Sequence, residues 1–282
     1  MQREILITGC SSGIGRCVAE GLKARGYRVF ATARKQDDVQ KLSNEGFESC
    51  QLDVSNSSSI VAALEDILDR TGGRLYGLFN NAGYAQPGAV EDLTRDMLRE
   101  QFETNLFGAQ ELANRLIPVM RTQKGGGRII YNSSVLGFIA LRFRGSYIAT
   151  KFAMEGLTDT LRMELRGSGI HVCLIEPGPI SSQFRRNAYA MFQRNIDREN
   201  SFYREIYAGV ERRLASEDDT DVPFTLGPEA VLDKVIHALE SSRPRARYYV
   251  TVPTYGFALL KRILPTRMLD WILIKASGAE NR

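Results

Sequence analysis

The chain has 282 residues, of which 43% are hydrophobic and 25% charged, and its formal net charge is +4 at pH 7. These values are typical of one globular domain, here residues 1–282, that buries a core without disulfides or a structural metal. The charge is small for this length and the basic clusters lack interleaved aromatic residues, so we expect no nucleic-acid partner. Four cysteines without a C-x-x-C pair, and two histidines in all, indicate reduced thiols, a cytoplasmic location and no metal site.

Short apolar strands alternate with helical patterns through most of the chain. We expect strands at residues 3–9, 27–33, 48–54, 74–83, 128–134, 170–178 and 247–253, and helices at about 13–25, 59–70, 94–121, 146–165 and 227–241. Because the strands are almost continuously apolar and are separated by helices, they predict an α/β fold with a parallel sheet covered on both faces. The charged and aromatic segment 181–226 has weak strand character, so we expect an insertion that forms a lid or wall for the substrate.

The last part of the chain, residues 255–278, has apolar residues at helical spacing and contains Lys261, Arg262, Arg267 and Lys275. These charges interrupt it too often for a bilayer-spanning helix, which needs about 20 apolar residues. We expect an amphipathic terminal helix that packs on the domain or on a partner subunit. The alternative is a basic amphipathic helix that associates weakly with a membrane surface.

A glycine-rich loop, TGCSSGIG at 8–15, lies between the first predicted strand and the first predicted helix. Gly9 permits a tight turn, while Gly13 and Gly15 let a phosphate and the helix backbone come close. The free N–H groups at the start of that helix would face a pyrophosphate. The loop therefore predicts a dinucleotide site at the first strand–helix junction.

Tyr147 and Lys151 stand four residues apart in a predicted helix that follows a strand ending in NSS. They share one helix face at the carboxyl edge of the sheet, where ligands bind in open α/β folds. A free tyrosine has a pKa of about 10, and a nearby ammonium group should lower that pKa toward a value useful for acid–base catalysis. Ser134 precedes Tyr147 by thirteen residues, and we favour it over Ser133 as the hydroxyl that binds the substrate oxygen.

These stretches together resemble the short-chain dehydrogenase/reductase family. The matching motifs, in the family's order over residues 3–182, are TGxxxGxG at 8–15, NNAG at 80–83, Asn105 in TNLFG, Ser134, YIATK at 147–151 and PG at 177–178. The resemblance implies a Rossmann-type, doubly wound sheet of seven parallel strands in the order 3-2-1-4-5-6-7, and a bound nicotinamide dinucleotide. The stretches LITGCSSGIG, LYGLFNNAG, IEPGPI and FTLGPEAV are most similar to reductases of lipophilic aldehydes and ketones, retinol dehydrogenases and 17β-hydroxysteroid dehydrogenases.

The resemblance also implies roles for individual residues. The catalytic set would be Asn105, Ser134, Tyr147 and Lys151. Lys151 would also hold the nicotinamide ribose, and Asn105 would support a water chain to Lys151. Asp53 and Val54 would meet the adenine, and Ser182 stands where the family has a threonine that contacts the carboxamide. The predicted cofactor contacts are Gly9, Ser11, Ser12, Gly13, Ile14, Gly15, Arg34, Asp53, Val54, Asn81, Ala82, Gly83, Tyr147, Lys151, Pro177, Gly178, Ile180 and Ser182.

The end of the second predicted strand, ATARK at 31–35, indicates which dinucleotide binds. An acid at this strand end usually accepts a hydrogen bond from the ribose 2′-hydroxyl, and it would repel a 2′-phosphate. This chain has Ala33 there, followed by Arg34, whose guanidinium suits a phosphate. The sequence therefore predicts NADP(H), and with it the direction of reduction.

The combined prediction is an NADP(H)-dependent oxidoreductase, a homodimer or homotetramer, that reduces aldehyde or ketone groups of small lipophilic substrates without a metal. The apolar residues expected to surround the substrate are Val135, Leu136, Phe138, Ile139, Phe184, Tyr189, Met191 and Phe192. Two alternatives from other classes are a dinucleotide sensor without turnover and a peripheral membrane protein with a vestigial site. The complete Tyr–Lys–Ser–Asn set argues against a sensor, because a sensor needs no acid.

Overall fold

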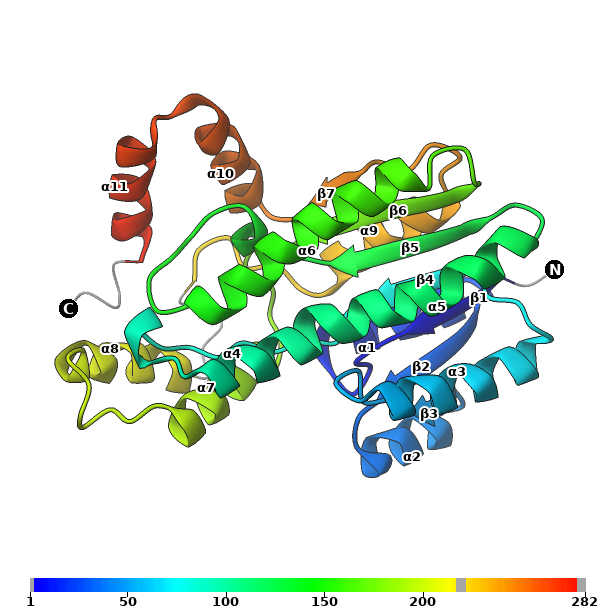
Figure 1. Cartoon of the computed structure of the whole chain (residues 1–282), viewed down its shortest axis with the longest axis horizontal. Coiled ribbons are helices and arrows are strands. Elements are labelled where there is room, and N and C mark those ends of the chain that lie inside the picture. Colours follow the sequence, from blue (N-terminus) through cyan, green and yellow to red (C-terminus); the bar gives the residue numbers. More distant parts are fainter. Residues whose placement is uncertain (1–2, 217–221, 278–282) are drawn as a thin grey trace.

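One parallel sheet organises the molecule. The computed structural model describes residues 3–216 and 222–277. Seven parallel strands form the sheet in the order β3-β2-β1-β4-β5-β6-β7 (Figure 1), which confirms the predicted Rossmann-type topology. The strands are β1 (Glu4–Ile7), β2 (Arg28–Ala33), β3 (Glu48–Gln51), β4 (Gly77–Asn80), β5 (Gly127–Asn132), β6 (Ile170–Glu176) and β7 (Arg247–Tyr249).

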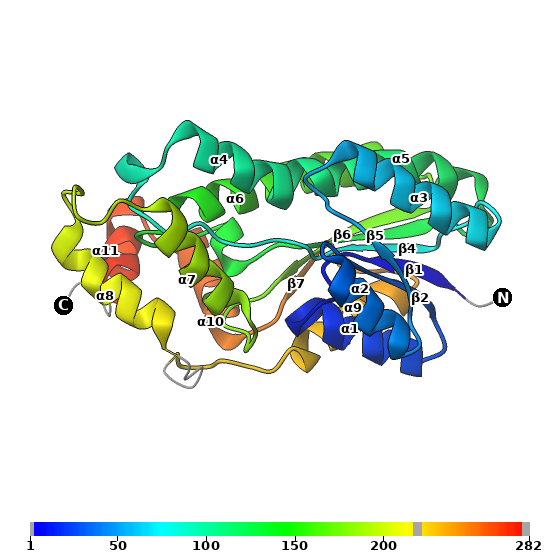
Figure 2. The ribbon, with the colours of Figure 1, turned by 90° about the horizontal axis from the view of Figure 1, so that it is seen from below.

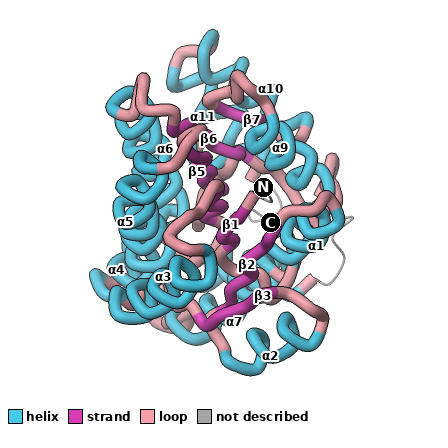
Figure 3. Tube along the Cα trace, turned by 90° about the vertical axis from the view of Figure 1, so that its right-hand side faces the viewer, coloured by secondary structure: helices cyan, strands magenta, loops and turns pink. Residues whose placement is uncertain are grey.

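Helices cover both faces of this sheet (Figures 2 and 3). One layer contains α1 (Gly13–Ala24), α2 (Gln36–Asn44) and α9 (Glu229–Glu240), and the other contains α3 (Ser57–Thr71), α5 (Gly108–Thr122) and α6 (Gly145–Glu164). Side chains of a strand alternate between the two faces. Leu6 therefore belongs to the apolar cluster under α3 and α5, whereas Ile5 and Ile7 belong to the cluster under α1. All three are fully buried, which explains why these three successive positions of the strand are apolar.

The helix predicted over 94–121 is interrupted in the structure. Its first part is α4 (Arg95–Phe102), a π-helical turn follows at Glu103–Phe107, and α5 begins at Gly108. A Cβ atom at Gly108 would lie 1.8 Å from the carbonyl oxygen of Val54, so a glycine is needed for this close approach. Single π-helical turns inside helices occur frequently at functional sites, and this one contains Asn105.

The described part of the predicted insertion 181–226, residues 181–216 and 222–226, contains two helices, α7 (Phe184–Asn195) and α8 (Arg204–Ala215). Its two ends meet, because Ile180 and Leu226 form an isolated parallel bridge. Phe192 of α7 and Tyr207 of α8 are buried with their ring centroids 5.2 Å apart. The two helices lie beyond the carboxyl ends of the strands, at the end of the molecule opposite β1's first residue (Figure 1).

The C-terminal segment forms two helices instead of the expected one, α10 (Val252–Ile263) and α11 (Thr266–Ala276). The break falls at Leu264, which is extended because the ring of Pro265 disfavours helical backbone in the residue before it. The strand predicted over 247–253 is also too long, since α10 begins at Val252. Residue 278 lies outside the described residues, and within those no helix is long and apolar enough to cross a membrane.

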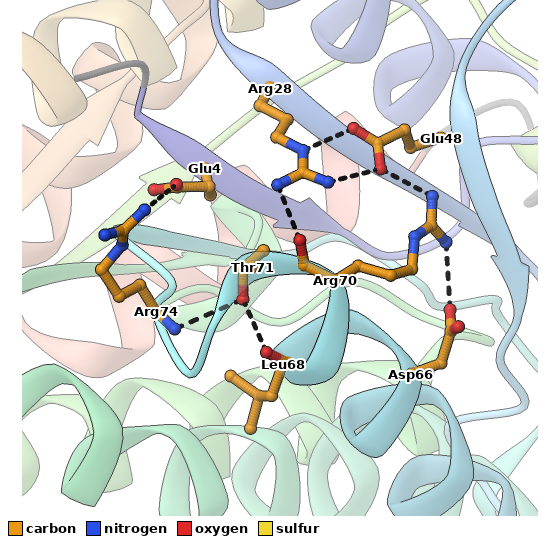
Figure 4. A network of polar contacts seen from close by, with 8 residues as sticks. All are labelled: Glu4, Arg28, Glu48, Asp66, Leu68, Arg70, Thr71 and Arg74. Atoms are coloured by element: carbon orange, nitrogen blue, oxygen red, sulfur yellow. Dashed lines mark hydrogen bonds and ion pairs between the residues drawn. The ribbon is translucent and has the colours of Figure 1, made fainter.

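A charged network holds the amino ends of β2 and β3, at the edge opposite the predicted site (Figure 4). Arg28 donates two hydrogen bonds to the Glu48 carboxylate, at 2.5 and 2.9 Å. Arg70 of α3 binds the same carboxylate at 2.6 Å and also pairs with Asp66. These guanidinium groups lower the pKa of Glu48. The network therefore joins two strands and a helix at a distance from the chemistry.

Candidate active site

Ser134 and Tyr147 meet where β5 ends and α6 begins. After Asn132 the chain leaves β5, and the Ser134 hydroxyl accepts a hydrogen bond from the N–H of Leu136 at 3.1 Å. The same hydroxyl hydrogen-bonds the phenol of Tyr147. Tyr147 lies in the first turn of α6 and Lys151 follows one turn later, with its ammonium 5.5 Å from the centre of the Tyr147 ring. The structure therefore brings these three predicted catalytic residues together.

The two candidate serines point to different partners. Ser133 is buried, and its hydroxyl donates to Oε1 of Glu155 at 2.5 Å. Ser134, by contrast, contacts the tyrosine. The geometry therefore favours Ser134 as the hydroxyl beside the reacting oxygen. Ser133 instead binds the buried Glu155 carboxyl group.

The pKa of Tyr147 differs from the sequence-based expectation. Burial raises it to about 12, and the hydrogen bond from Ser134 offsets only part of that rise. The expectation that Lys151 lowers this pKa is wrong for the structure described here. The physical reason is that the phenol is only 8% exposed, so the loss of hydration of a phenolate outweighs other effects. At neutral pH Tyr147 is accordingly a protonated phenol.

Lys151 is also buried, and its ammonium donates to the carbonyl oxygen of Asn132 at 2.6 Å. Burial lowers its pKa to about 8, against the opposing effect of the Glu155 charge. The amide of Asn132 in turn donates to Oδ1 of Asn81 at 2.9 Å. A chain of hydrogen bonds therefore connects the lysine to the NNAG segment. Asn132 was not among the predicted site residues, although it directly precedes the two serines.

Asn105 is held between the loop that follows β4 and helix α6. Its amide donates to the carbonyl oxygen of Tyr84 at 2.9 Å and to the Thr150 hydroxyl at 3.3 Å, and its Oδ1 accepts from the N–H of Tyr84 at 3.1 Å. Thr150 in turn donates to the carbonyl oxygen of Tyr147. Asn105 thus contacts the catalytic helix next to Lys151, and its water chain to that lysine stays a prediction.

The glycine loop has the conformation that its sequence predicts. Gly9 and Gly13 have positive φ angles of 72° and 56°, which favour glycine. A Cβ atom at Gly15 would lie 2.3 Å from the carbonyl oxygen of Gly9, and one at Gly13 would lie 3.0 Å from Cβ of Ser182. The side chain of Ser182 therefore lies against the glycine loop, and its contact with a carboxamide stays a prediction.

The start of α1 suits a phosphate. Its N-cap, Ser12, makes no side-chain cap hydrogen bond, and its first turn contains no acidic residue. Such a helix end presents N–H donors and partial positive charge to an anion. The loop is further fixed by Thr8, whose hydroxyl accepts hydrogen bonds from the N–H groups of Asn81 and Ala82, both at 2.9 Å. The residues present therefore fit a dinucleotide.

Arg34 directly follows β2, whose last residue, Ala33, is buried. Its carbonyl oxygen accepts from the Gln51 amide at 2.9 Å, which anchors the backbone, while its side chain is exposed. Among the described residues it has no ion-pair partner, whereas Arg16 on α1 pairs with Glu20 and with Glu45. Arg34 is thus a free guanidinium beside the predicted adenosine end of the site.

The other predicted cofactor residues also follow the carboxyl ends of strands. Asp53 and Val54 come after β3, and the Asp53 carboxylate accepts from the N–H and hydroxyl of Ser55. The Asn81 amide donates to the carbonyl oxygens of Thr8 and Gly9, so it fixes the backbone of the glycine loop. The rest are Ser11 and Ile14 in the glycine loop, Gly83 in NNAG, and Pro177, Gly178 and Ile180 after β6.

An apolar cluster surrounds the tyrosine, and we call it the Tyr147 cluster. Its buried members include Leu136, Ile139, Phe143, Tyr147, Phe192, Tyr207 and Leu273, with Val135, Phe138, Tyr189, Phe257 and Leu269 packed at its rim. Phe184, the first residue of α7, stands edge-on to Tyr147 with the ring centroids 5.4 Å apart. Helices α7, α8 and α11 therefore enclose the reacting group in apolar side chains.

Two buried carboxyl groups lie behind Ser133. Glu155 follows Lys151 by one turn of α6, and its charge raises the pKa of Glu176, the last residue of β6. Arg247 contacts both, at 3.0 Å from Oε2 of Glu155 and 3.0 Å from Oε1 of Glu176. The sequence contained one signal for this group, because Tyr147, Lys151 and Glu155 repeat at a spacing of four.

Comparison with known proteins agrees with this geometry. The model of the short chain dehydrogenase family matches residues 3–192. The chain belongs to the short-chain dehydrogenases. It is 44% identical over 273 residues to an Escherichia coli (strain K12) protein named uncharacterized oxidoreductase YbbO, covering 97% of this chain and 94% of that one.

Two further relatives of this short-chain dehydrogenase have more specific names. An NADPH-dependent 3-dehydrocapnine reductase from Ornithobacterium rhinotracheale is 31% identical over 280 residues, covering 97% of this chain and 96% of that one. Retinol dehydrogenase 16 from Mus musculus is 34% identical over 280 residues, covering 95% and 87%. The family assignment and an oxidoreductase activity of this family follow, and the predicted resemblance is confirmed.

Proposed function

We propose that this short-chain dehydrogenase uses NADP(H) to reduce aldehyde or ketone groups of lipophilic molecules to alcohols. The observation that carries the proposal is the protonated phenol of Tyr147, hydrogen-bonded to Ser134, one turn before Lys151 and inside an apolar cluster. A phenol held in this state beside a hydroxyl is suited to give a proton to a developing alkoxide.

The side chains divide the work of the reaction. A bound nicotinamide dinucleotide supplies or takes up the hydride. Ser134 donates a hydrogen bond to the carbonyl oxygen and Tyr147 protonates it, while the Lys151 ammonium, fixed on the carbonyl oxygen of Asn132, adds positive charge nearby. In the reverse direction Tyr147 must first lose its proton, which its raised pKa opposes. The free protein is therefore better prepared for reduction than for oxidation.

Arg34 supports the choice of the phosphorylated dinucleotide. It is exposed, has no ion-pair partner among the described residues, and follows the small, buried Ala33, where an acid would select the unphosphorylated form. A guanidinium is well matched to a phosphate group. The relative named as an NADPH-dependent reductase is consistent with this choice.

The Tyr147 cluster supports a lipophilic substrate. Its side chains offer dispersion contacts and exclude water from the phenol, so an apolar group attached to the carbonyl carbon would be favoured there. The relative named retinol dehydrogenase is consistent with such a substrate.

The proposal is tested by measuring nicotinamide oxidation with a panel of aldehydes and ketones that range from short and charged to long and apolar. We expect turnover with NADPH that rises with the apolar area of the substrate and is lost in Tyr147→Phe. The matched control is Tyr27→Phe, another buried tyrosine, which packs far from the site in the cluster under α1. Tight dinucleotide binding without turnover of any carbonyl compound would instead indicate a sensor.

A further inference from the structure

The two C-terminal helices expose an apolar face that no other described part of the chain covers. Exposed apolar residues recur at helical spacing along α10. They recur in the same way along α11, after the break at Pro265. We call them the C-terminal apolar face: Val252, Tyr255, Leu259, Ile263, Met268, Trp271 and Ile274, each 50–65% exposed. Soluble monomers rarely expose so many large apolar side chains in one short segment, so the face needs a partner.

Basic residues accompany this face. Arg267 and Lys275 fall on the same side of α11 as Trp271, by helical spacing, and Arg262 borders the exposed side of α10. The Lys275 ammonium lies 3.5 Å from the centre of the Trp271 ring. The sequence from residue 252 to residue 276 contains one acidic residue, Asp270, and four basic residues. A tryptophan and a tyrosine among aliphatic and basic side chains are typical of helices that lie in a membrane interface.

The opposite side of the same helices is anchored. Leu273 of α11 is buried in the Tyr147 cluster, and Phe257 and Leu269 pack against it. On α10, Ala258 is buried and the Lys261 ammonium donates to the carbonyl oxygen of Phe138. The exposed face is therefore the outer surface of a packed wall of the substrate region, and it sits at the same end of the molecule as α7 and α8 (Figures 1 and 2).

We propose that the C-terminal apolar face docks on the surface of a lipid bilayer that contains anionic phospholipids. Neither helix is long enough to span a bilayer, so the helices lie in the interface with their apolar side chains inserted and Arg262, Arg267 and Lys275 among the headgroups. Charge favours a lipid surface over a second copy of this chain, because a second copy would bring the same excess of basic residues to the contact. Docking does not depend on the proposed reaction.

The test is co-sedimentation of the full chain with vesicles of phosphatidylcholine alone and of phosphatidylcholine mixed with phosphatidylserine. We expect binding to the mixed vesicles that weakens as salt is raised, and little binding to phosphatidylcholine alone. Ile263→Ser combined with Trp271→Ser should abolish sedimentation. Arg267→Gln and Lys275→Gln should each weaken it by about fivefold, the factor for about 1 kcal/mol per basic residue near an anionic surface.

The matched control is Phe202→Ser, which removes another exposed aromatic ring, 87% exposed, two residues before α8 begins. This variant should bind vesicles like the unchanged chain. The proposal is overturned if the unchanged chain stays in solution with both vesicle types, or if it binds both equally at low and high salt. It is also overturned if light scattering shows that the Ile263→Ser, Trp271→Ser pair turns a dimer into a monomer without any vesicle binding. Because vesicle binding is measured without turnover, failure here leaves the proposed reaction untouched.

Discussion

Glu155 and Glu176 each place a buried carboxyl oxygen 3.0 Å from the Arg247 guanidinium, directly behind the active site. Glu176 is fully buried at the end of β6, and Glu155 lies on the helix that carries Tyr147 and Lys151. Burial raises the pKa of both groups, that of Glu176 to about 9. Two carboxylates this close cannot both ionise at low cost, so the pair retains one proton at neutral pH beside the Arg247 guanidinium.

This shared proton makes stability depend on pH. In the unfolded chain Glu176 loses its proton near its ordinary pKa of 4.5. In the folded protein its pKa is about 9, so the carboxyl group keeps the proton to a much higher pH. Between those values the folded state binds more protons than the unfolded state, so the free energy of unfolding falls as the pH rises. Glu176→Gln is always neutral and should remove this part of the decline. Thermal unfolding of both proteins across that interval should give melting temperatures that diverge in favour of the variant as the pH rises, and parallel curves would contradict the assignment.

The second prediction separates the two serines. Ser134→Ala removes the hydroxyl that contacts Tyr147 and should lower kcat for carbonyl reduction by about 100-fold or more, as for the loss of one oxyanion donor. Ser133→Ala removes the bond to Glu155, so it should lower the melting temperature while kcat changes much less. Steady-state rates and thermal unfolding of the two variants provide the comparison. If Ser133→Ala lost the greater share of kcat, the roles of the two serines would have to be exchanged.

Lys151 gives a prediction about the pH profile of the rate. Burial lowers its pKa to about 8, while that of Tyr147 is about 12. The pH dependence of kcat/KM reports groups in the free enzyme. Reduction should therefore decline above about pH 8 as Lys151 becomes neutral, well before Tyr147 ionises. Glu155→Gln removes the negative charge that raises the Lys151 pKa and should move this decline to lower pH. A profile that stays flat to about pH 10 in both proteins would refute this account.

The fold and the main catalytic residues were predictable because they rest on local patterns. Apolar strands, the glycine loop, and the spacing of Tyr147 and Lys151 each involve neighbouring residues. The Glu155–Glu176 contact was not predictable in this way, since it joins a helix to the end of the next strand and depends on which faces meet. The raised pKa of Tyr147 likewise depends on burial by α7, a segment distant in sequence. The break at Pro265, by contrast, had a local signal, because proline restricts the residue before it.

The last prediction concerns the choice of dinucleotide. Arg34 is exposed and unpaired within the described residues, so Arg34→Ala should change little in the fold. If its guanidinium binds the 2′-phosphate, the variant loses a charge-assisted contact worth roughly 1.5–3 kcal/mol. The KM for NADPH should then rise by roughly tenfold or more, while the KM for NADH stays nearly constant. The matched control is Lys35→Ala, the neighbouring exposed base at the N-cap of α2, which should have a smaller effect on NADPH. Equal increases for both dinucleotides in Arg34→Ala would remove Arg34 from the phosphate site and return the cofactor preference to an open question between the two forms.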